Sequence, residues 1–235
     1  MEESIPEKIA QVRQRINAAT RRAGRPASAV RLMAVTKTVD DRRILEAAHA
    51  GVDILGENYV QEARRKIDLM GRPAEWHHIG HLQTNKVKYA VKLFDMIHAI
   101  DRIEVAEELD KRCAQDGRIM KVLIEVNVGG ESTKQGIDPE NVLPFCRQMS
   151  RLDFLSVQGL MTMAPWFDDP EAARPYFSLL RTLRDRIREV HIPRITMTEL
   201  SMGMSGDFEV AVEEGATIVR IGHAIFGARP PRKEM

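Results

Sequence analysis

The strongest constraint on the fold is a regular alternation of short apolar segments and longer amphipathic segments along the chain. The short segments are rich in aliphatic and β-branched residues and are bounded by turn formers, so they predict strands at 32–37, 53–56, 75–79, 95–99, 119–128, 155–162, 195–200 and 217–222. The intervening segments have helical periodicity and predict helices at 41–50, 59–70, 84–92, 102–115, 139–150, 170–190 and 206–214. Eight strands alternating with helices in 235 residues predict an α/β fold, a single (β/α)8 TIM barrel over residues 1–235.

One further helix precedes the first predicted strand. Ser4 and Glu7 have the spacing of a capping box, apolar residues recur every three or four positions, and Gly24 ends the pattern, which predicts an extra N-terminal helix over 5–24. The alternative fold is a doubly wound open sheet, which favours a glycine-rich turn after its first strand. That position is occupied by Val35-Thr36-Lys37-Thr38, which favours the barrel. No internal repeat or linker indicates a second domain.

Charge and composition exclude several classes of protein. The 35 Lys and Arg residues are balanced by 34 Asp and Glu residues, and no basic stripe is interleaved with aromatic residues, so we expect no nucleic-acid partner. The longest uncharged stretch, 154–167, is too short for a membrane span, and the N-terminus lacks the pattern of a secretory signal. The two cysteines, Cys113 and Cys146, have neither zinc-site nor disulfide-framework spacing. We therefore expect a cytoplasmic protein with reduced thiols and no membrane association.

Polar residues stand at the predicted carboxyl ends of the strands, where a barrel carries its chemistry. They are Lys37, Glu57, Asn58, His77 to His81, His98, Asn127, Met161, Thr162, Ser201 to Ser205 and Arg220 to His223. Lys37 follows the apolar run 32–35, and a desolvated lysine amine is the nucleophile needed for a Schiff base. The alternative is a lysine that extends its charge from the strand end into solvent.

Two glycine-containing loops follow the seventh and eighth predicted strands, at 201–207 and 220–224. This fold often binds a phosphate there, through backbone N–H groups and a short helix, although such loops can also be simple turns. A Schiff-base lysine facing a phosphate site is the layout needed for pyridoxal 5′-phosphate. Arg220 could then face the pyridine nitrogen and disfavour its protonation, or could instead pair with Glu213 or Glu214.

A metal site at the histidine-rich third strand is the hypothesis that we reject. His77 and His78 alternate along the strand and therefore point to opposite faces, and His81 lies beyond it. No carboxylate at ligand spacing completes a coordination set. We expect no metal.

Several motifs resemble those of the pyridoxal phosphate homeostasis proteins. They are Ala34-Val35-Thr36-Lys37, Gly56-Glu57-Asn58-Tyr59, the run from Trp76 to Lys86, Gly159-Leu160-Met161, the run from Leu200 to Ser205 and Val219-Arg220-Ile221-Gly222. The resemblance extends from the first helix to Gly227. It implies one barrel like the N-terminal domain of bacterial alanine racemase, with the cofactor as a covalent aldimine on Lys37. It also implies that Asn58 lies beside the cofactor, that Arg220 faces the ring nitrogen, and that the phosphate is held by Ser205, Gly222 and His223.

The same resemblance implies a role in vitamin B6 homeostasis without an established reaction, with PLP-dependent apoenzymes as candidate partners. The rival function is an amino-acid racemase or decarboxylase on the same barrel. Racemases of this fold add a second domain and a catalytic tyrosine, whereas this chain ends shortly after Gly227 and contains only Tyr59, Tyr89 and Tyr176. A third possibility is a Schiff-base lyase or isomerase acting on a sugar phosphate through Lys37. We expect a monomer.

Two residues depart from the family pattern. His223 stands where the family usually has threonine, and His78 stands where it usually has phenylalanine. A protonated imidazole at position 223 would attract a phosphate, so we expect cofactor retention to weaken as the pH rises from mildly acidic to mildly basic.

Overall fold

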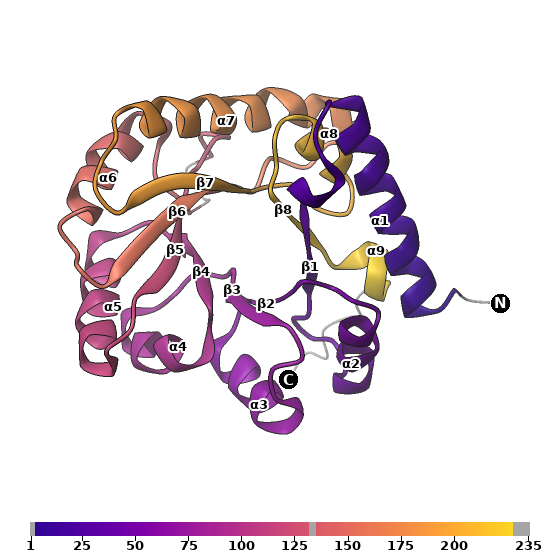
Figure 1. The fold of residues 1–235 in the computed structure, drawn as a ribbon, viewed down its shortest axis with the longest axis horizontal. Coiled ribbons are helices and arrows are strands. Elements are labelled where there is room, and N and C mark those ends of the chain that lie inside the picture. The colour runs from indigo at the N-terminus through magenta and orange to yellow at the C-terminus, as the bar shows by residue number, and fades with distance from the viewer. Residues whose placement is uncertain (1–2, 132–134, 228–235) are drawn as a thin grey trace.

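A closed barrel of eight parallel strands forms the centre of the molecule, as the computed structural model shows for residues 3–131 and 135–227 (Figure 1). The strands follow one another around the barrel in chain order, and the last one pairs with the first. They are β1 (Arg31–Val35), β2 (Ile54–Glu57), β3 (Glu75–His78), β4 (Met96–Ile100), β5 (Met120–Glu125), β6 (Leu155–Met161), β7 (Ile195–Ser201) and β8 (Ile218–Ile221). The predicted fold class is confirmed.

Helices surround the barrel, and most of them join consecutive strands (Figure 1). They are α1 (Ile5–Arg22), α2 (Asp41–His49), α3 (Val60–Met70), α4 (Val87–Leu93), α5 (Ile103–Asp116), α6 (Val142–Met149), α7 (Arg174–Glu189), α8 (Phe208–Glu213) and α9 (His223–Phe226). Short 3-10 turns precede β1, α4, α6 and α7, at Ala27–Ala29, Thr84–Lys86, Pro139–Asn141 and Pro170–Ala173. None of the helices in the described ranges is long and apolar enough to cross a membrane.

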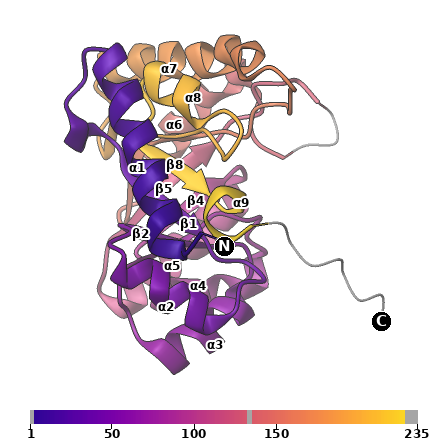
Figure 2. The same cartoon turned by 90° about the vertical axis from the view of Figure 1, so that its right-hand side faces the viewer.

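The extra N-terminal helix is present and packs along the outside of the barrel (Figure 2). The Ser4 hydroxyl accepts a hydrogen bond from the Glu7 N–H, and the Glu7 carboxylate accepts one from the Ser4 N–H, which completes the predicted capping box. The apolar face of α1 contacts α2, α8 and α9. The first helix is thereby joined to the last elements of the fold.

Most predicted boundaries differ from the structure by one to three residues, and one short helix was missed. The strand predicted at 119–128 ends at Glu125, and beyond it Val126 makes only an isolated bridge with Ile137. The four-residue helix α9 was not predicted, because a segment shorter than two turns has no readable periodicity.

The core has an outer and an inner part. The main apolar cluster lies between the strands and the helices, and two small apolar clusters, around Met33 and Leu123, lie apart from it. At Gly159 in β6 a Cβ atom would lie 1.9 Å from the Glu199 carbonyl oxygen of β7, so only glycine permits this close approach.

Cys113 and Cys146 are buried and free, and burial raises the pKa of these thiols to about 11 and about 12. Neither thiol is an activated nucleophile.

Candidate functional site

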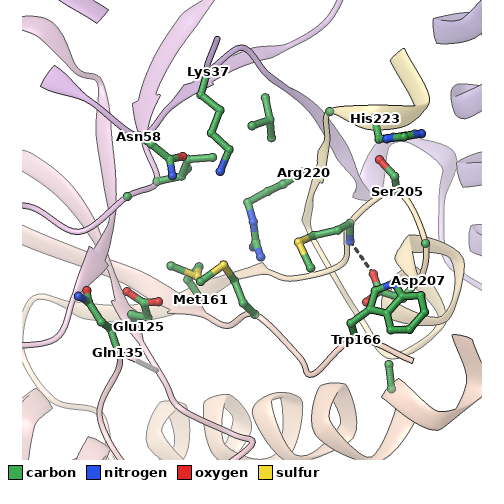
Figure 3. A pocket seen from close by; sticks show the side chains of 18 of the residues that line it. Lys37, Asn58, Glu125, Gln135, Met161, Trp166, Ser205, Asp207, Arg220 and His223 are labelled. Atoms are coloured by element: carbon green, nitrogen blue, oxygen red, sulfur yellow. Dashed lines mark hydrogen bonds between the residues drawn. The ribbon is translucent and has the colours of Figure 1, made fainter. Parts of the chain in front are cut away.

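A cavity of about 780 Å³ lies at the carboxyl ends of the strands (Figure 3). All six site residues predicted from the sequence line it: Lys37, Asn58, Ser205, Arg220, Gly222 and His223. Seven other polar residues from the strand ends do not line this cavity: Glu57, His77, His78, His98, Asn127, Thr162 and Ser201. The strand-end rule therefore collected residues that line the cavity together with several that do not.

A buried lysine, Lys66 of α3, fixes the strand ends that carry Lys37 and Asn58. Its Nζ donates to the carbonyl oxygen of Thr36 at 2.7 Å and to Oε1 of Glu57 at 2.6 Å. The side chains of Lys66 and Glu57 are fully buried. Thr36 and Glu57 directly precede Lys37 and Asn58 in the chain, so one ion pair sets the positions of both.

The hydrogen-bond network of Lys66 and Glu57 also includes Thr38, the residue that follows Lys37. The carboxylate of Glu62 accepts from Lys66 Nζ and from the backbone N–H of Thr38, each at 2.7 Å. The Thr36 hydroxyl donates to Glu57 Oε1, also at 2.7 Å. Burial raises the pKa of Glu57, and the Lys66 ammonium opposes that rise. Both neighbours of Lys37 are thus tied to a single buried network.

The loop after β7 is a compact turn. Asp207 closes it by accepting a hydrogen bond from the Met204 N–H at 2.6 Å, drawn as the dashed line in Figure 3. Gly203 enters the turn with φ +90°, and a Cβ atom there would lie 2.5 Å from the Ala211 Cβ of α8. Glycine is therefore required where this loop packs against the helix.

A hydrogen bond joins this loop to the one after β8, since the Ser205 hydroxyl accepts from the Ala224 N–H at 3.2 Å. Within the described ranges, no intramolecular hydrogen bond from the backbone N–H of Gly206 or His223 is found. His223 is the first residue of α9, where helical N–H groups have no partner inside the helix. The two loops therefore present N–H donors and a hydroxyl at one end of the cavity.

Arg220 projects from β8 into the cavity and is only 4% exposed (Figure 3). Its guanidinium donates to the carbonyl oxygen and the hydroxyl of Ser201, at 2.7 and 2.9 Å, and to the carbonyl oxygen of Thr162 at 2.7 Å. Burial lowers its pKa to about 10, so the group is still charged at neutral pH.

The alternative ion pair of Arg220 with Glu213 or Glu214 is wrong. Those two carboxylates pair instead with arginines on the outer helices, namely Arg22, Arg174 and Arg181. The guanidinium of Arg220 is therefore held by neutral acceptors, and its charge is directed into the cavity.

A chain of buried polar side chains supports Arg220 from inside the barrel. Ser201 Oγ lies 3.0 Å from His98 Nδ1, and His98 Nε2 lies 2.9 Å from His77 Nδ1. His77 Nε2 in turn lies 3.0 Å from the Glu75 carboxylate at the opposite, amino-terminal end of the strands. Together with Arg220, these residues form a continuous hydrogen-bonded relay through the barrel interior.

The groups at the two ends of the relay determine which ring nitrogen of His77 and of His98 carries the proton. Hydrogen bonds from His77 and Arg31 lower the pKa of Glu75 to about 2, so this carboxylate only accepts, and His77 carries its proton on Nε2. Burial lowers the pKa of His77 and of His98, which keeps both rings neutral. A neutral His77 must then accept at Nδ1 from His98 Nε2–H, and His98 must accept at Nδ1 from the Ser201 hydroxyl. All donors therefore point from Arg220 towards Glu75.

His78 and His81, the other histidines near the third strand, are not part of this relay. His78 points away from His77 and packs against Phe94, with ring centroids 5.0 Å apart, while His81 lines the cavity. Burial lowers the pKa of His78 to about 4. In the part of the chain that the structure describes, no group of three or more His, Cys, Asp or Glu side chains could hold a metal ion.

Sequence reasoning missed several cavity residues, among them Trp166, Phe167 and Glu125. Trp166 and Phe167 lie in the long segment after β6, and no local pattern marks them as part of a site. Glu125, the last residue of β5, was also missed, because the predicted strand continued beyond it. A single acidic residue within the apolar run 122–126 was the available signal.

Comparison with known proteins agrees with this architecture. The family model described as "Alanine racemase, N-terminal domain" matches residues 8–230. A relative named pyridoxal phosphate homeostasis protein, from Aquifex aeolicus, is 46% identical over 95% of this chain and 97% of its own length. A relative of the same name from Vibrio cholerae is 40% identical over 96% of this chain and 97% of its own length.

A solved structure of similar sequence also matches closely. PipY of Synechococcus elongatus, described as having PLP bound, has a TM-score of 0.81 and 35% identity, covering 95% of this chain and all of that one (100%). Identity at this level over nearly the full length, together with the family model, confirms the resemblance seen in the motifs. The chain belongs to the pyridoxal phosphate homeostasis protein family, which is built on the alanine racemase N-terminal domain.

Proposed function

We propose that the protein binds pyridoxal 5′-phosphate in the 780 Å³ cavity as a Schiff base on Lys37 and serves vitamin B6 homeostasis without catalytic turnover. The observation that carries the proposal is the meeting, around one cavity, of a lysine amine, a buried guanidinium and two loops with N–H donors. The names of the relatives and the PLP-bound PipY structure support the choice of ligand.

The residues present fit this cofactor. The Ser205 hydroxyl and the N–H groups of Gly206 and His223 suit a phosphate. Asn58 Oδ1 is buried and finds no hydrogen-bond partner among the described residues, which suits a hydroxyl or N–H donor on a bound ring. Gly80 allows its backbone to lie close to Asn58, because a Cβ atom at this position would lie 2.6 Å from the Asn58 carbonyl oxygen.

Arg220 argues for storage of the cofactor over its use in carbanion chemistry. Pyridoxal phosphate supplies an aldehyde that captures amines and a pyridine ring that withdraws electrons when it is protonated. A permanently charged guanidinium facing that ring nitrogen opposes its protonation. The relay from Glu75 through Ser201 holds the guanidinium in one orientation.

The rival racemase or decarboxylase function lacks a tyrosine base among the described cavity residues. Tyr59 and Tyr89 are exposed by 54% and 40%, and Tyr176 stacks on Phe167 with its centroid 5.7 Å away. None of the three lines the cavity. As parts of the same proposal, the protein acts as a cytoplasmic monomer, and PLP-dependent apoenzymes are its partners.

The test is the visible spectrum of the purified protein, followed by borohydride reduction and mass mapping. We expect a yellow protein with a reduced pyridoxyl group on Lys37, and no such group in Lys37→Ala. Lys86→Ala, at the rim and outside the cavity lining, is the matched control and should keep the adduct.

An adduct that persists in Lys37→Ala would refute the assignment and point to Lys86 or to Lys134, which lies outside the described residues. A colourless protein that cannot be reconstituted would refute cofactor binding and favour the sugar-phosphate lyase. Measurable racemase or decarboxylase turnover by the loaded protein would refute the non-catalytic role.

A further inference from the structure

Glu125 is a buried carboxyl group that the proposed function does not use. Its residue is 5% exposed, and it ends β5 with its side chain in the wall of the cavity (Figure 3). Its carboxyl oxygens open onto the cavity and are not fully enclosed, and no hydrogen bond or ion pair to them is found across residues 3–131 and 135–227. A desolvated carboxylate without a partner is strongly disfavoured, so the site suits a ligand that supplies a cation or a donor.

The groups around Glu125 do not satisfy it. The charge of Arg220 favours the ionised form of Glu125, but the guanidinium makes its three hydrogen bonds to Ser201 and Thr162. Asp101, at the end of β4, adds a like charge, and the strand neighbour on β6 is the uncharged Met161. Burial and Asp101 together raise the pKa of Glu125 to about 7, against the opposing effect of Arg220.

The position of Glu125 separates it from the proposed phosphate loops. In the closed barrel, β5 lies four strands from β1 in either direction, so Glu125 faces the Lys37 side across the mouth. Figure 3 shows Glu125 and Gln135 on the side of the cavity away from Ser205 and His223, with Arg220 between the two ends. A cavity of about 780 Å³ is in the upper part of the roughly 300–1,000 Å³ range of small-molecule sites.

We propose that the Glu125 end of the cavity is a binding subsite for a small primary ammonium compound, an amine or amino acid, whose ammonium group pairs with the Glu125 carboxylate. The inference rests on the proposed function, because the cofactor fills the other end. An ammonium group supplies three N–H donors in a compact cation, and the apolar side chains of Met161 and Met163 offer contact to a short aliphatic chain.

The test uses borohydride-reduced, cofactor-loaded protein, in which the Lys37 bond can no longer exchange with added amines. Propylamine, L-alanine and propionate are titrated calorimetrically at pH 7 in PIPES and in ACES, buffers that contain no primary amine. We expect propylamine and alanine to bind and propionate not to bind. Because a paired carboxylate holds its proton less tightly, binding should release up to about half a proton per site.

Glu125→Gln keeps the shape and removes the charge. We expect at least about a tenfold loss of propylamine affinity and no proton release. Asp101→Asn, whose side chain is outside the cavity lining, should keep the binding and move the proton release to lower pH, because a like charge is removed.

The subsite is refuted if propylamine does not bind to the loaded protein, if propionate binds equally well, or if Glu125→Gln leaves affinity and proton release unchanged. The mass of the reduced protein separates this result from failure of the proposed function. Protein without a pyridoxyl adduct on Lys37 refutes the proposed function itself, whereas adducted protein without ammonium binding refutes only the subsite.

Discussion

Replacing Lys66 by methionine should strongly destabilise the protein, because the substitution leaves the buried Glu57 carboxylate without its cation. The Lys66 ammonium makes three hydrogen bonds, of 2.6 and 2.7 Å, to Glu57, Glu62 and the Thr36 carbonyl oxygen. The second carboxylate oxygen of Glu57 is buried and has no hydrogen-bond partner among the described residues. Removing one member of such a buried pair costs about 3–5 kcal/mol of unfolding free energy.

Urea unfolding followed by circular dichroism measures this loss, and thermal unfolding should show a decrease in Tm of roughly 6–20 °C for a chain of this size. Arg65→Met is the matched control. Arg65 is the neighbouring residue on α3 and pairs with Asp41 at 2.7 Å, but its side chain is 57% exposed. An exposed pair contributes at most about 1 kcal/mol.

The double variant Glu57→Met/Lys66→Met separates the unpaired charge from lost packing. It removes both charges, so it should recover much of the stability lost in Lys66→Met. Lys66→Met should also weaken cofactor binding, because the Thr36 carbonyl oxygen loses its donor and Glu62, which accepts from the Thr38 N–H, loses its cation. A loss in Lys66→Met no larger than in Arg65→Met, or no recovery in the double variant, would refute the reasoning.

Three further predictions concern histidines. His78→Phe should reduce the loss of stability in acid. Burial lowers the pKa of His78 in the folded state to about 4, against 6.5 in the unfolded state, so only the unfolded state takes up a proton as the pH falls below about 6.5. In the natural protein this uptake lowers the free energy of unfolding by about 3 kcal/mol by pH 4. Urea titrations at pH 7 and pH 4.5 should show a smaller loss in the variant, and an equal loss would contradict the assignment. Nitrogen-15 NMR should show His77 and His98 neutral with the proton on Nε2, and a protonated Nδ1 on either ring would break the relay as described. His223→Thr should weaken pyridoxal phosphate binding, because it removes the imidazole from the cavity wall and keeps the backbone N–H of that position, and unchanged affinity would exclude a contribution of the imidazole.

The fold could be predicted because its information is local. Each strand is a short aliphatic run between turn formers, and the capping box at Ser4 marks the start of α1 unambiguously. The site residues could be collected for a related reason, since a barrel places whatever follows its strands at one mouth. The short α9 and the early end of β5 escaped prediction because neither leaves a periodic signal.

The supporting residues could not be predicted, because sequence alone does not separate the inside of a barrel from its outside. Lys66 stands in α3 among charged residues and looks like a solvated side chain, yet it is fully buried. His98 stands in an apolar strand where either face is covered, and only the closed barrel brings it to Ser201, 103 residues away. Such contacts depend on the tertiary arrangement and have no local signature.

The docking of α1 against α8 and α9 has a consequence for synthesis of the chain. The buried apolar residues of α1 (Ile5, Ile9, Val12 and Ile16) emerge from the ribosome well before two of the three helices that they contact, since α8 begins at Phe208 and α9 follows it. At roughly 5–20 residues per second, the 186 residues from Ala23 to Phe208 take about 10–40 s to synthesise. Throughout that interval α2 is the one contacting helix already made, so part of the apolar face of α1 stays uncovered until the last elements of the barrel are synthesised.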